Sequence, residues 1–348
     1  MSNRRCPRCQ ATYAAPARYC VKDGSPLVEA DRQSPERAEA TKEVEPPPFL
    51  VTLGGQVLDE RYRVGSRLGE GGMSYVYRAQ DIETGQPVAL KILLPRLSRD
   101  PASIERLRRE ASLAMRLNHP NVCPILRLGE APHQLIYLVM PYLEGEPLSE
   151  HESRRGPFSV NEGIPLLVQM CRGLQHAHEL QIIHRDLKPE NVMLVPEEGV
   201  RAGATPKHRA VVMDFGLAKE RRAGPEVAKL TATGIVLGTP EFMSPEQIRG
   251  KPLDARSDVY ALGILAFELF TGQLPFTGKS AQETMIARLR GAPLRLREVR
   301  EGLPAKLEVV IAKTLAADPA ERYSTMNELG HAFHSVLGSG VIGRLFGR

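Results

Sequence analysis

The sequence predicts an α+β protein of two lobes, one rich in strands and one rich in helices. Short runs typical of β-strands begin at Tyr62 and recur as far as residue 143. From residue 144 onward apolar residues recur at helical spacing, and residues 257–272 form a largely apolar stretch of helix length. At 348 residues the chain exceeds one average domain, which leaves room for both lobes and a small appendage.

Composition and charge are those of an ordinary globular protein. Hydrophobic residues make up 42% and charged residues 25% of the chain, so a sizeable core can form. The net charge of +5 is small and the two signs are interspersed, so no nucleic-acid partner is expected. The sequence has no run of about 18 apolar residues and no signal peptide, which predicts a cytoplasmic protein without a membrane span. Cys123 and Cys171 are expected to be core thiols.

The first 28 residues carry a cysteine pattern that resembles half of a zinc ribbon. Cys6 and Cys9 share one tight turn, from which two thiolates can take adjacent corners of a tetrahedral zinc site, and Cys20 lies in a second turn. The expected fourth cysteine is absent, and Asp23 stands in its place. Two interpretations stay open: an irregular Zn²⁺ site of these four residues, or a metal-free turn.

Residues 29–56 are predicted to be a linker. They are rich in Ala, Glu, Arg and Pro, a composition that cannot bury a core and that is semi-rigid where prolines cluster. We therefore expect a ribbon-like segment over residues 1–28 and the linker over 29–56. The β-rich lobe with its connecting strand would follow over 57–143, the helical lobe over 144–337, and a flexible tail over 338–348.

A glycine-rich turn between two predicted strands suits phosphate binding. Gly69 and Gly71 let the backbone close over a phosphate chain, although such a turn alone is usually only a hairpin. Lys91 follows on a strand of apolar neighbours, where a buried ammonium group needs a partner. Glu110 supplies that partner, from an amphipathic helix that begins near Pro101.

The run from His184 to Asn191 reads His-Arg-Asp-Leu-Lys-Pro-Glu-Asn and gathers the groups that phosphoryl transfer needs. Asp186 is suited to accept a proton from a hydroxyl nucleophile, and Lys188 is suited to neutralise charge on the transferring group. Asn191 can hold magnesium through its amide oxygen. An isolated His-x-Asp is a weak signal, but the full run is specific.

These motifs resemble those of bacterial eukaryotic-type (Hanks-type) Ser/Thr protein kinases, over roughly residues 57–335. The resemblance implies a two-lobed protein-kinase-like fold with a small antiparallel-sheet N-lobe and a mainly helical C-lobe, joined by a hinge. ATP with Mg²⁺ or Mn²⁺ would bind between the lobes. The implied reaction is transfer of the γ-phosphoryl group to Ser or Thr hydroxyls of protein substrates.

The resemblance also assigns the nucleotide site. Lys91 would hold the α- and β-phosphates while Glu110 orients it, and Asn191 with Asp214 would bind magnesium. The sequence departs from the family pattern at Ser74, which replaces a glycine, and at Pro141, whose carbonyl can still serve adenine because proline removes only a donor. The expected ATP contacts are Leu68, Gly69, Gly71, Val76, Ala89, Lys91, Met140, Pro141, Leu143 and Met193.

Residues 217–246 resemble an activation segment. Thr231 and Thr233 resemble the paired threonines of bacterial relatives, and Arg185 would receive their phosphates, which predicts autophosphorylation through a transient homodimer. Thr239 resembles the threonine that contacts the catalytic Asp and Lys in Ser/Thr kinases.

Further residues are assigned structural duties by the same resemblance. Glu246 is expected to pair with Arg322 and brace the activation segment. Asp258 is expected to tie down the backbone of the catalytic loop, from a helix that Ser257 caps and Gly272 ends. The long connection over 196–209 is expected to be a surface excursion.

Two alternatives belong to other functional classes. A pseudokinase would bind nucleotide or act as a scaffold without phosphotransfer, but Lys91, Asp186 and Asp214, whose loss is its usual sign, are all present. A nucleic-acid-binding ribbon is the second alternative, and three cysteines without an extended basic or aromatic surface do not support it. The sequence identifies neither the substrate nor the upstream signal.

Overall fold

The computed structural model describes residues 53–71, 74–93, 101–131, 135–197, 208–215 and 240–338, together with three pairs of residues nearer the N-terminus. The chain divides into two units, Met1–Thr52 and Leu53–Arg348. In the first unit the three pairs, β1 (Arg4–Arg5), β2 (Thr12–Tyr13) and β3 (Val28–Glu29), form an antiparallel sheet in the order β2-β1-β3. The four residues predicted to bind zinc lie outside the described residues.

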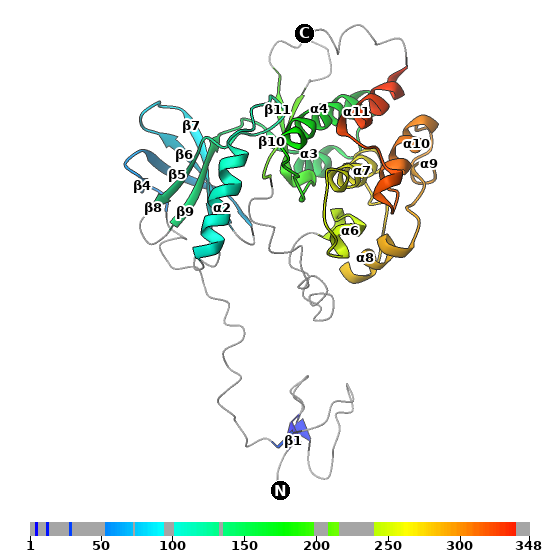
Figure 1. The fold of residues 1–348 in the computed structure, drawn as a ribbon, viewed down its shortest axis with the longest axis horizontal. Coiled ribbons are helices and arrows are strands. Elements are labelled where there is room, and N and C mark those ends of the chain that lie inside the picture. The colour runs from blue at the N-terminus through cyan, green and yellow to red at the C-terminus, as the bar shows by residue number, and fades with distance from the viewer. Residues whose placement is uncertain are drawn as a thin grey trace. The chain divides into compact units, whose positions relative to one another are not determined.

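A six-stranded antiparallel sheet begins the second unit (Figure 1). Its strands are β4 (Val57–Leu58), β5 (Tyr62–Gly71), β6 (Ser74–Asp81), β7 (Pro87–Leu93), β8 (Arg127–Ala131) and β9 (Leu135–Pro141), in the order β4-β5-β6-β7-β9-β8. Alternate residues of β6 from Tyr75 to Asp81 are buried, because successive side chains of a strand point to opposite faces. Helix α2 (Pro101–Ala114) packs on the sheet through Leu107, which joins Leu93 and Ile136 in one apolar cluster.

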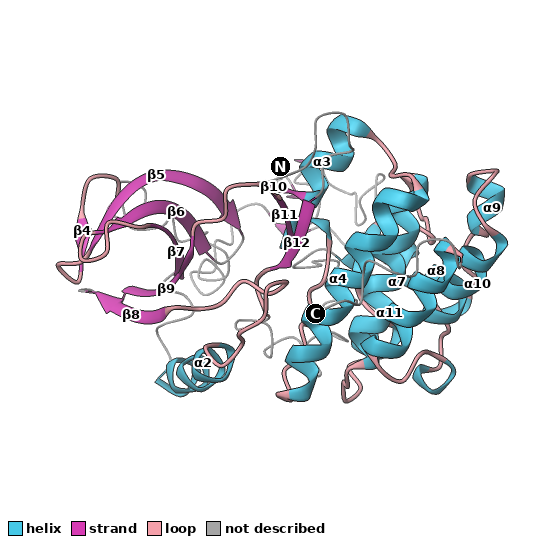
Figure 2. Ribbon diagram, turned by 90° about the horizontal axis from the view of Figure 1, so that it is seen from above, coloured by secondary structure: helices cyan, strands magenta, loops and turns pink. Residues whose placement is uncertain are grey.

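The remainder of the second unit is mainly helical (Figure 2). A small antiparallel sheet of β10 (Glu146–Pro147), β11 (Val192–Pro196) and β12 (His208–Val212) lies between the six-stranded sheet and the helices. The helices are α3 (Leu148–Arg155), α4 (Val160–Glu179), α6 (Pro245–Ile248), α7 (Arg256–Thr271), α8 (Ala281–Arg290), α9 (Leu296–Val299), α10 (Ala305–Thr314) and α11 (Met326–His334). Short 3₁₀ turns are η3 (Pro189–Asn191), η5 (Pro240–Phe242), η6 (Pro319–Glu321) and η7 (Ser335–Leu337).

Local sequence explains how the two central helices begin and end. Helix α4 starts at a capping box, in which the side chains of Ser159 and Glu162 each accept the other's backbone N–H. Helix α7 is buried almost all round and ends at Gly272, whose φ of 70° favours glycine. The prediction that Ser257 caps α7 is wrong. The N-cap is Ala255, and the Ser257 hydroxyl instead donates a hydrogen bond to Glu246.

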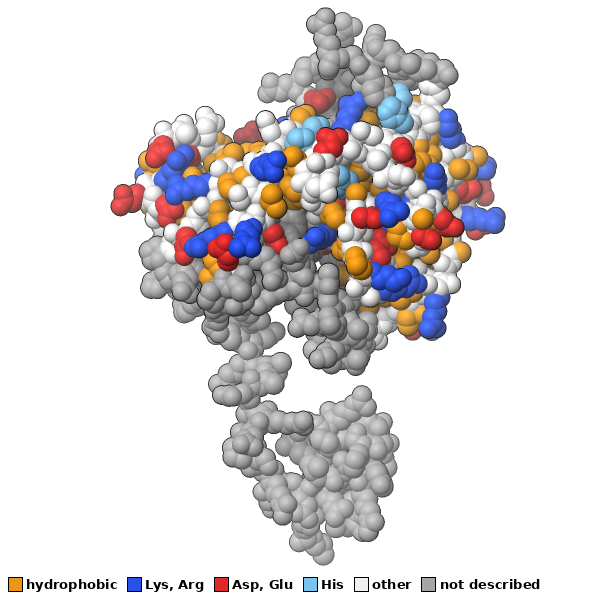
Figure 3. All heavy atoms as spheres, in the orientation of Figure 1, with side chains coloured by type: hydrophobic (Ala, Val, Ile, Leu, Met, Phe, Trp, Pro, Cys, Tyr) orange, Lys and Arg blue, Asp and Glu red, His pale blue; other side chains and the backbone are white. Residues whose placement is uncertain are grey.

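One large apolar core joins α4, α7, α10 and α11. Cys123 and Cys171 are buried thiols, as predicted. The predicted excursion over 196–209 begins and ends in strand, since Pro196 pairs with His208, and residues 198–207 lie outside the described part. Basic and acidic side chains are interspersed on the face shown in Figure 3. None of the helices in the described ranges has the length and hydropathy that a membrane span requires.

Candidate active site

The loop that carries Asp186 runs from the end of α4 to β11 and is anchored by Asp258 of α7. Asp258 is 1% exposed, and it accepts hydrogen bonds from His184 N at 2.8 Å and from Arg185 N at 2.9 Å. Arg185 has a φ of 65°, which is uncommon for a residue other than glycine, and these two bonds help to hold it there. The backbone of the loop is therefore fixed from beneath by one carboxylate.

A histidine that the sequence did not single out supports this anchor. His178 Nε2 lies 2.7 Å from Asp258 Oδ2, and both side chains are buried. Burial alone raises the pKa of Asp258. The hydrogen bond and charge of His178 and the N–H of His184 lower this pKa by more than burial raises it, so the pKa falls below its ordinary value. The anchor is an ionised carboxylate, which is the stronger acceptor for the two backbone N–H groups.

Asp186 and Asn191 are joined within the loop. Asn191 Nδ2 donates to the backbone oxygen of Asp186 at 2.8 Å and to Asp186 Oδ2 at 3.1 Å. Because Asn191 uses its amide nitrogen in this way, its amide oxygen is the atom that can bind a metal. The Asp186 N–H lies 3.3 Å from Nδ1 of the buried His184, which adds a further constraint on the position of the carboxylate.

Lys91 and Asp214 meet between the two lobes. Lys91 Nζ, from β7, lies 2.7 Å from Asp214 Oδ1, and the two side chains are 20% and 32% exposed. Asp214 follows β12 with a φ of 59°. Its neighbour Met213 is tied to the catalytic loop at both ends, since Met213 N donates to Asn191 O and Met213 O accepts from His184 Nε2, each at 2.8 Å. The Lys91–Asp214 pair is thus tied, through Met213, to the loop that carries Asp186.

Four of the residues predicted to contact ATP come together from three parts of the chain. Ala89 of β7 is the cross-strand neighbour of Met140 in β9, and both join Leu143 and Met193 in one apolar cluster. Val76 of β6 pairs with Gly69 of β5, in the glycine-rich stretch that also contains Gly71 and the exposed Leu68. Pro141 ends β9.

A model of the protein kinase domain matches residues 62–334 of the chain. The chain belongs to the protein kinase family. The serine/threonine-protein kinase PknB of Mycobacterium leprae is 39% identical over 275 residues, which are 78% of this chain and 42% of that protein. The serine/threonine-protein kinase Pkn3 of Myxococcus xanthus is 38% identical over 271 residues, 77% of this chain and 48% of that protein.

A solved kinase domain, PknI of M. tuberculosis, has a TM-score of 0.64 and 27% identity, covering 82% of this chain and 99% of that one. These matches confirm the predicted protein-kinase fold and the resemblance to bacterial Ser/Thr kinases. The chain spans less than half the length of the curated relatives named above.

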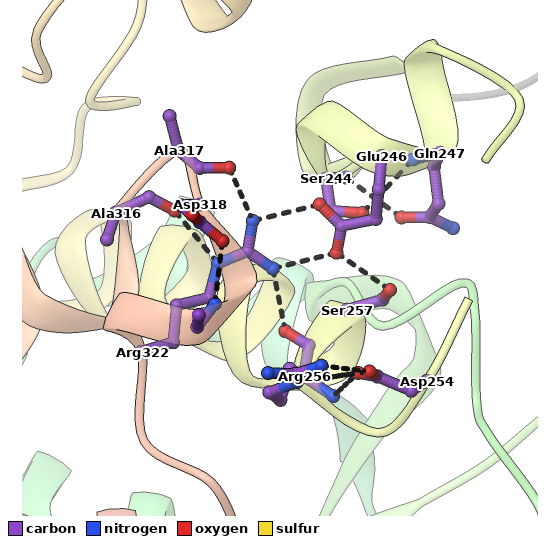
Figure 4. A network of polar contacts seen from close by, with 11 residues as sticks. Ser244, Glu246, Gln247, Asp254, Arg256, Ser257, Ala316, Ala317, Asp318 and Arg322 are labelled. Atoms are coloured by element: carbon purple, nitrogen blue, oxygen red, sulfur yellow. Dashed lines mark hydrogen bonds and ion pairs between the residues drawn. The ribbon is translucent and has the colours of Figure 1, made fainter. Parts of the chain in front are cut away.

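In this kinase domain Glu246 of α6 and Arg322 form a buried ion pair (Figure 4). The guanidinium meets both carboxylate oxygens, at 2.7 Å and 2.9 Å, and the Ser257 hydroxyl adds a bond at 2.8 Å. Arg322 also donates to the carbonyls of Ala316 and Arg256. Burial raises the pKa of Glu246, but Arg322 outweighs it, so the pKa lies below its ordinary value.

Two further kinase-domain residues carry contacts that sequence reasoning missed. Gln247 Nε2 donates to Arg185 O at 2.9 Å and links α6 to the catalytic loop. Cys123 lies in the apolar cluster with Met140, and burial together with the charge of Asp214 raises the pKa of its thiol to about 12. The sequence predicts that Cys123 is buried, but it signals neither the position of Cys123 beside Met140 nor the bond of Gln247, because both contacts join distant segments.

Other predicted site residues are placed less completely. Thr231, Thr233 and Thr239 lie outside the described residues. Lys188 is half-buried just before η3, and Glu110 is half-buried on α2, so the expected Lys91–Glu110 pair stays a prediction. In the described part of the chain, no group of three or more His, Cys, Asp or Glu side chains is placed to hold a metal. A magnesium site here would rest on two protein ligands.

Proposed function

We propose that the chain is an ATP-dependent protein kinase that transfers the γ-phosphoryl group to Ser or Thr hydroxyls of proteins. The observation that carries the proposal is the Lys91–Asp214 pair at 2.7 Å, which Met213 fastens to the loop of Asp186 and Asn191. The proposed cation and metal-binding carboxylate are thus joined to the loop that carries the proposed base, and phosphoryl transfer requires these three groups together. The names of the bacterial relatives agree with this activity.

In the proposed reaction Asp186 orients the acceptor hydroxyl and takes its proton, while Lys91 and Lys188 offset charge on the phosphates. The amide oxygen of Asn191 and the carboxylate of Asp214 would hold Mg²⁺ or Mn²⁺, which neutralises charge on ATP. Two protein ligands suffice, because magnesium commonly completes its shell with substrate phosphates and water. The apolar cluster around Met140 would receive the adenine ring.

Transfer of radiolabelled phosphate from ATP tests the proposal. Asp186→Asn keeps the side-chain shape but removes the base, so the rate should fall by roughly two to four orders of magnitude while ATP binding persists. If the wild type and Asp186→Asn incorporate label equally, Asp186 is not the base. If the wild type binds ATP and transfers none, the pseudokinase alternative replaces the proposal.

We also propose that the kinase is switched on in the cytoplasm by autophosphorylation of Thr231 and Thr233 in a transient homodimer. Arg185 supports this, because it lies next to the catalytic Asp186 with its backbone held by Asp258. A phosphothreonine brought to such a cation gains charge-assisted hydrogen bonds and can order its segment. Phosphopeptide mapping is the test, and fully active enzyme with both threonines unmodified would contradict the idea.

Zinc binding by Cys6, Cys9, Cys20 and Asp23 is a separate proposal for the N-terminal unit. The proposal is supported by the pairing of β1 with β2, because these two strands flank the stretch of sequence that contains Cys6 and Cys9. Metal analysis of the purified protein and of Cys6→Ser tests it. Less than stoichiometric zinc in the wild type, or unchanged zinc in the variant, would count against it.

A further inference from the structure

Arg288 of α8 is a buried cation outside the motifs that define the kinase site. Its side chain is 2% exposed, although arginine is almost never fully buried unless it is paired or hydrogen-bonded. The guanidinium lies over the ring of Phe276, 5.8 Å from its centroid. Burial lowers the pKa of Arg288, against the influence of Tyr260 and Glu241. The fold therefore retains a costly charge at this position.

The guanidinium of Arg288 is hydrogen-bonded to one short segment of backbone, Glu241–Met243. Its Nη2 donates to the backbone oxygen of Glu241 and its Nη1 to that of Met243, at 2.6 Å and 3.0 Å. These two carbonyls flank Phe242 in and after η5. A planar guanidinium that spans two carbonyls fixes both the position and the orientation of a turn, which a single donor cannot do.

The turn held by Arg288 faces the catalytic loop. Phe242 lines a cavity of about 360 Å³ together with Pro189 and Glu190, which belong to the loop that carries Asp186. Beyond the turn, Gln247 of α6 is bonded to Arg185 O. Arg288 thus holds the Glu241–Met243 turn, and Gln247 joins α6, which follows this turn in the chain, to the loop that carries Asp186.

We propose that Arg288 is a positioning residue for the acceptor protein: by clamping the Glu241–Met243 turn, it sets the wall beside Asp186 against which the acceptor segment lies. The inference rests on the proposed kinase activity. The nucleotide side of the site is built from Lys91, Asp214 and the apolar cluster around Met140, whereas the two hydrogen bonds of Arg288 go to the backbone of Glu241 and Met243. Loss of the clamp should therefore weaken binding of the acceptor and leave binding of ATP unchanged.

Steady-state kinetics of the full chain with Arg288→Met and Arg288→Lys test the proposal. The acceptor is the best substrate from a degenerate Ser/Thr peptide library. Arg288→Met should raise the KM for this peptide about tenfold, since two charge-assisted bonds are lost, and change the KM for ATP less than about twofold. Arg288→Lys, which keeps the charge and can reach one carbonyl, should lie between the wild type and Arg288→Met.

Arg300 provides a matched control, because its Nη1 also donates to two backbone carbonyls, those of Phe158 and Phe270, neither of which belongs to the Glu241–Met243 turn. Arg300→Met should lower Tm without raising the KM for the peptide. The proposal is overturned if Arg288→Met and Arg300→Met give the same KM for the peptide, or if the two KM values of Arg288→Met rise together. If Arg288→Met does not fold, Arg288→Lys decides, and an unchanged KM for the peptide overturns the proposal. A wild type without transferase activity overturns the proposed function itself.

Discussion

The buried Glu246–Arg322 pair allows a quantitative test of how firmly α6 is held in the fold. In Arg322→Met the guanidinium is replaced by an apolar side chain of comparable length. The carboxylate of Glu246, 6% exposed, then loses both of its bonds to arginine and keeps the one to the Ser257 hydroxyl. The backbone carbonyls of Ala316 and Arg256, which accept hydrogen bonds from Arg322 in the wild type, lose this donor in the variant as well.

The expected cost follows from this geometry. Removing one partner of a buried pair leaves an uncompensated charge, which typically lowers the free energy of unfolding by about 3–5 kcal/mol. For a domain of this size that corresponds to a fall in Tm of roughly 10 °C. By contrast, Arg108→Met breaks a pair with Glu130 in which the side chains are 50% and 48% exposed, and such exposed pairs contribute about 0–1 kcal/mol.

Urea denaturation of Arg322→Met, Glu246→Gln and the double variant measures the coupling between the two side chains. The pKa of Glu246 lies below its ordinary value in the folded protein, so the pair stabilises the fold above the ordinary carboxyl pKa and this stabilisation is lost as pH falls through the folded value. The difference between the wild type and Arg322→Met should therefore shrink in acid. A cost below about 1 kcal/mol at neutral pH, equal to that of Arg108→Met, would refute the reasoning.

Two other predictions concern stability away from the chemistry. Burial and the nearby charges of Glu268 and Glu190 raise the pKa of Glu152 to about 8. Protonated Glu152 therefore contributes favourably to the free energy of unfolding at low pH, and this contribution is lost as pH rises through about 8. Glu152→Gln should flatten the fall in the urea midpoint between pH 6 and pH 8, and an unchanged slope would contradict this. In α4, a Cβ at Gly173 would stand 2.7 Å from the backbone oxygen of Asn121, whereas in α11 a Cβ at Gly330 would stand 3.2 Å from Cys171 Cβ. Gly173→Ala should lower the free energy of unfolding, measured by urea denaturation, by about 1–3 kcal/mol, and Gly330→Ala should lower it much less. Equal losses in the two variants would count against close packing at Gly173.

Much of the fold and the centre of the site could be predicted from the sequence because their signals are local. The run from His184 to Asn191 places the proposed base and a proposed metal ligand within one loop, so their proximity needs no knowledge of packing. The start of α2 at Pro101 and the end of α7 at Gly272 follow from residues whose backbone preferences act within one turn. The adenine residues were located by their resemblance to the kinase pattern, and the structure brings Ala89 and Met140 together across paired strands.

Tertiary structure alone decided the contacts that join segments far apart in the sequence. His178 supports Asp258, Gln247 holds the backbone of Arg185, and Arg288 clamps the turn at Phe242, yet each of these side chains is an ordinary polar residue of a helix when only its neighbours are known. Ser257 shows the same limit, since its hydroxyl bonds Glu246 instead of capping its own helix. A side chain's partner depends on which distant backbone the core brings within hydrogen-bond distance, and no local pattern encodes that distance.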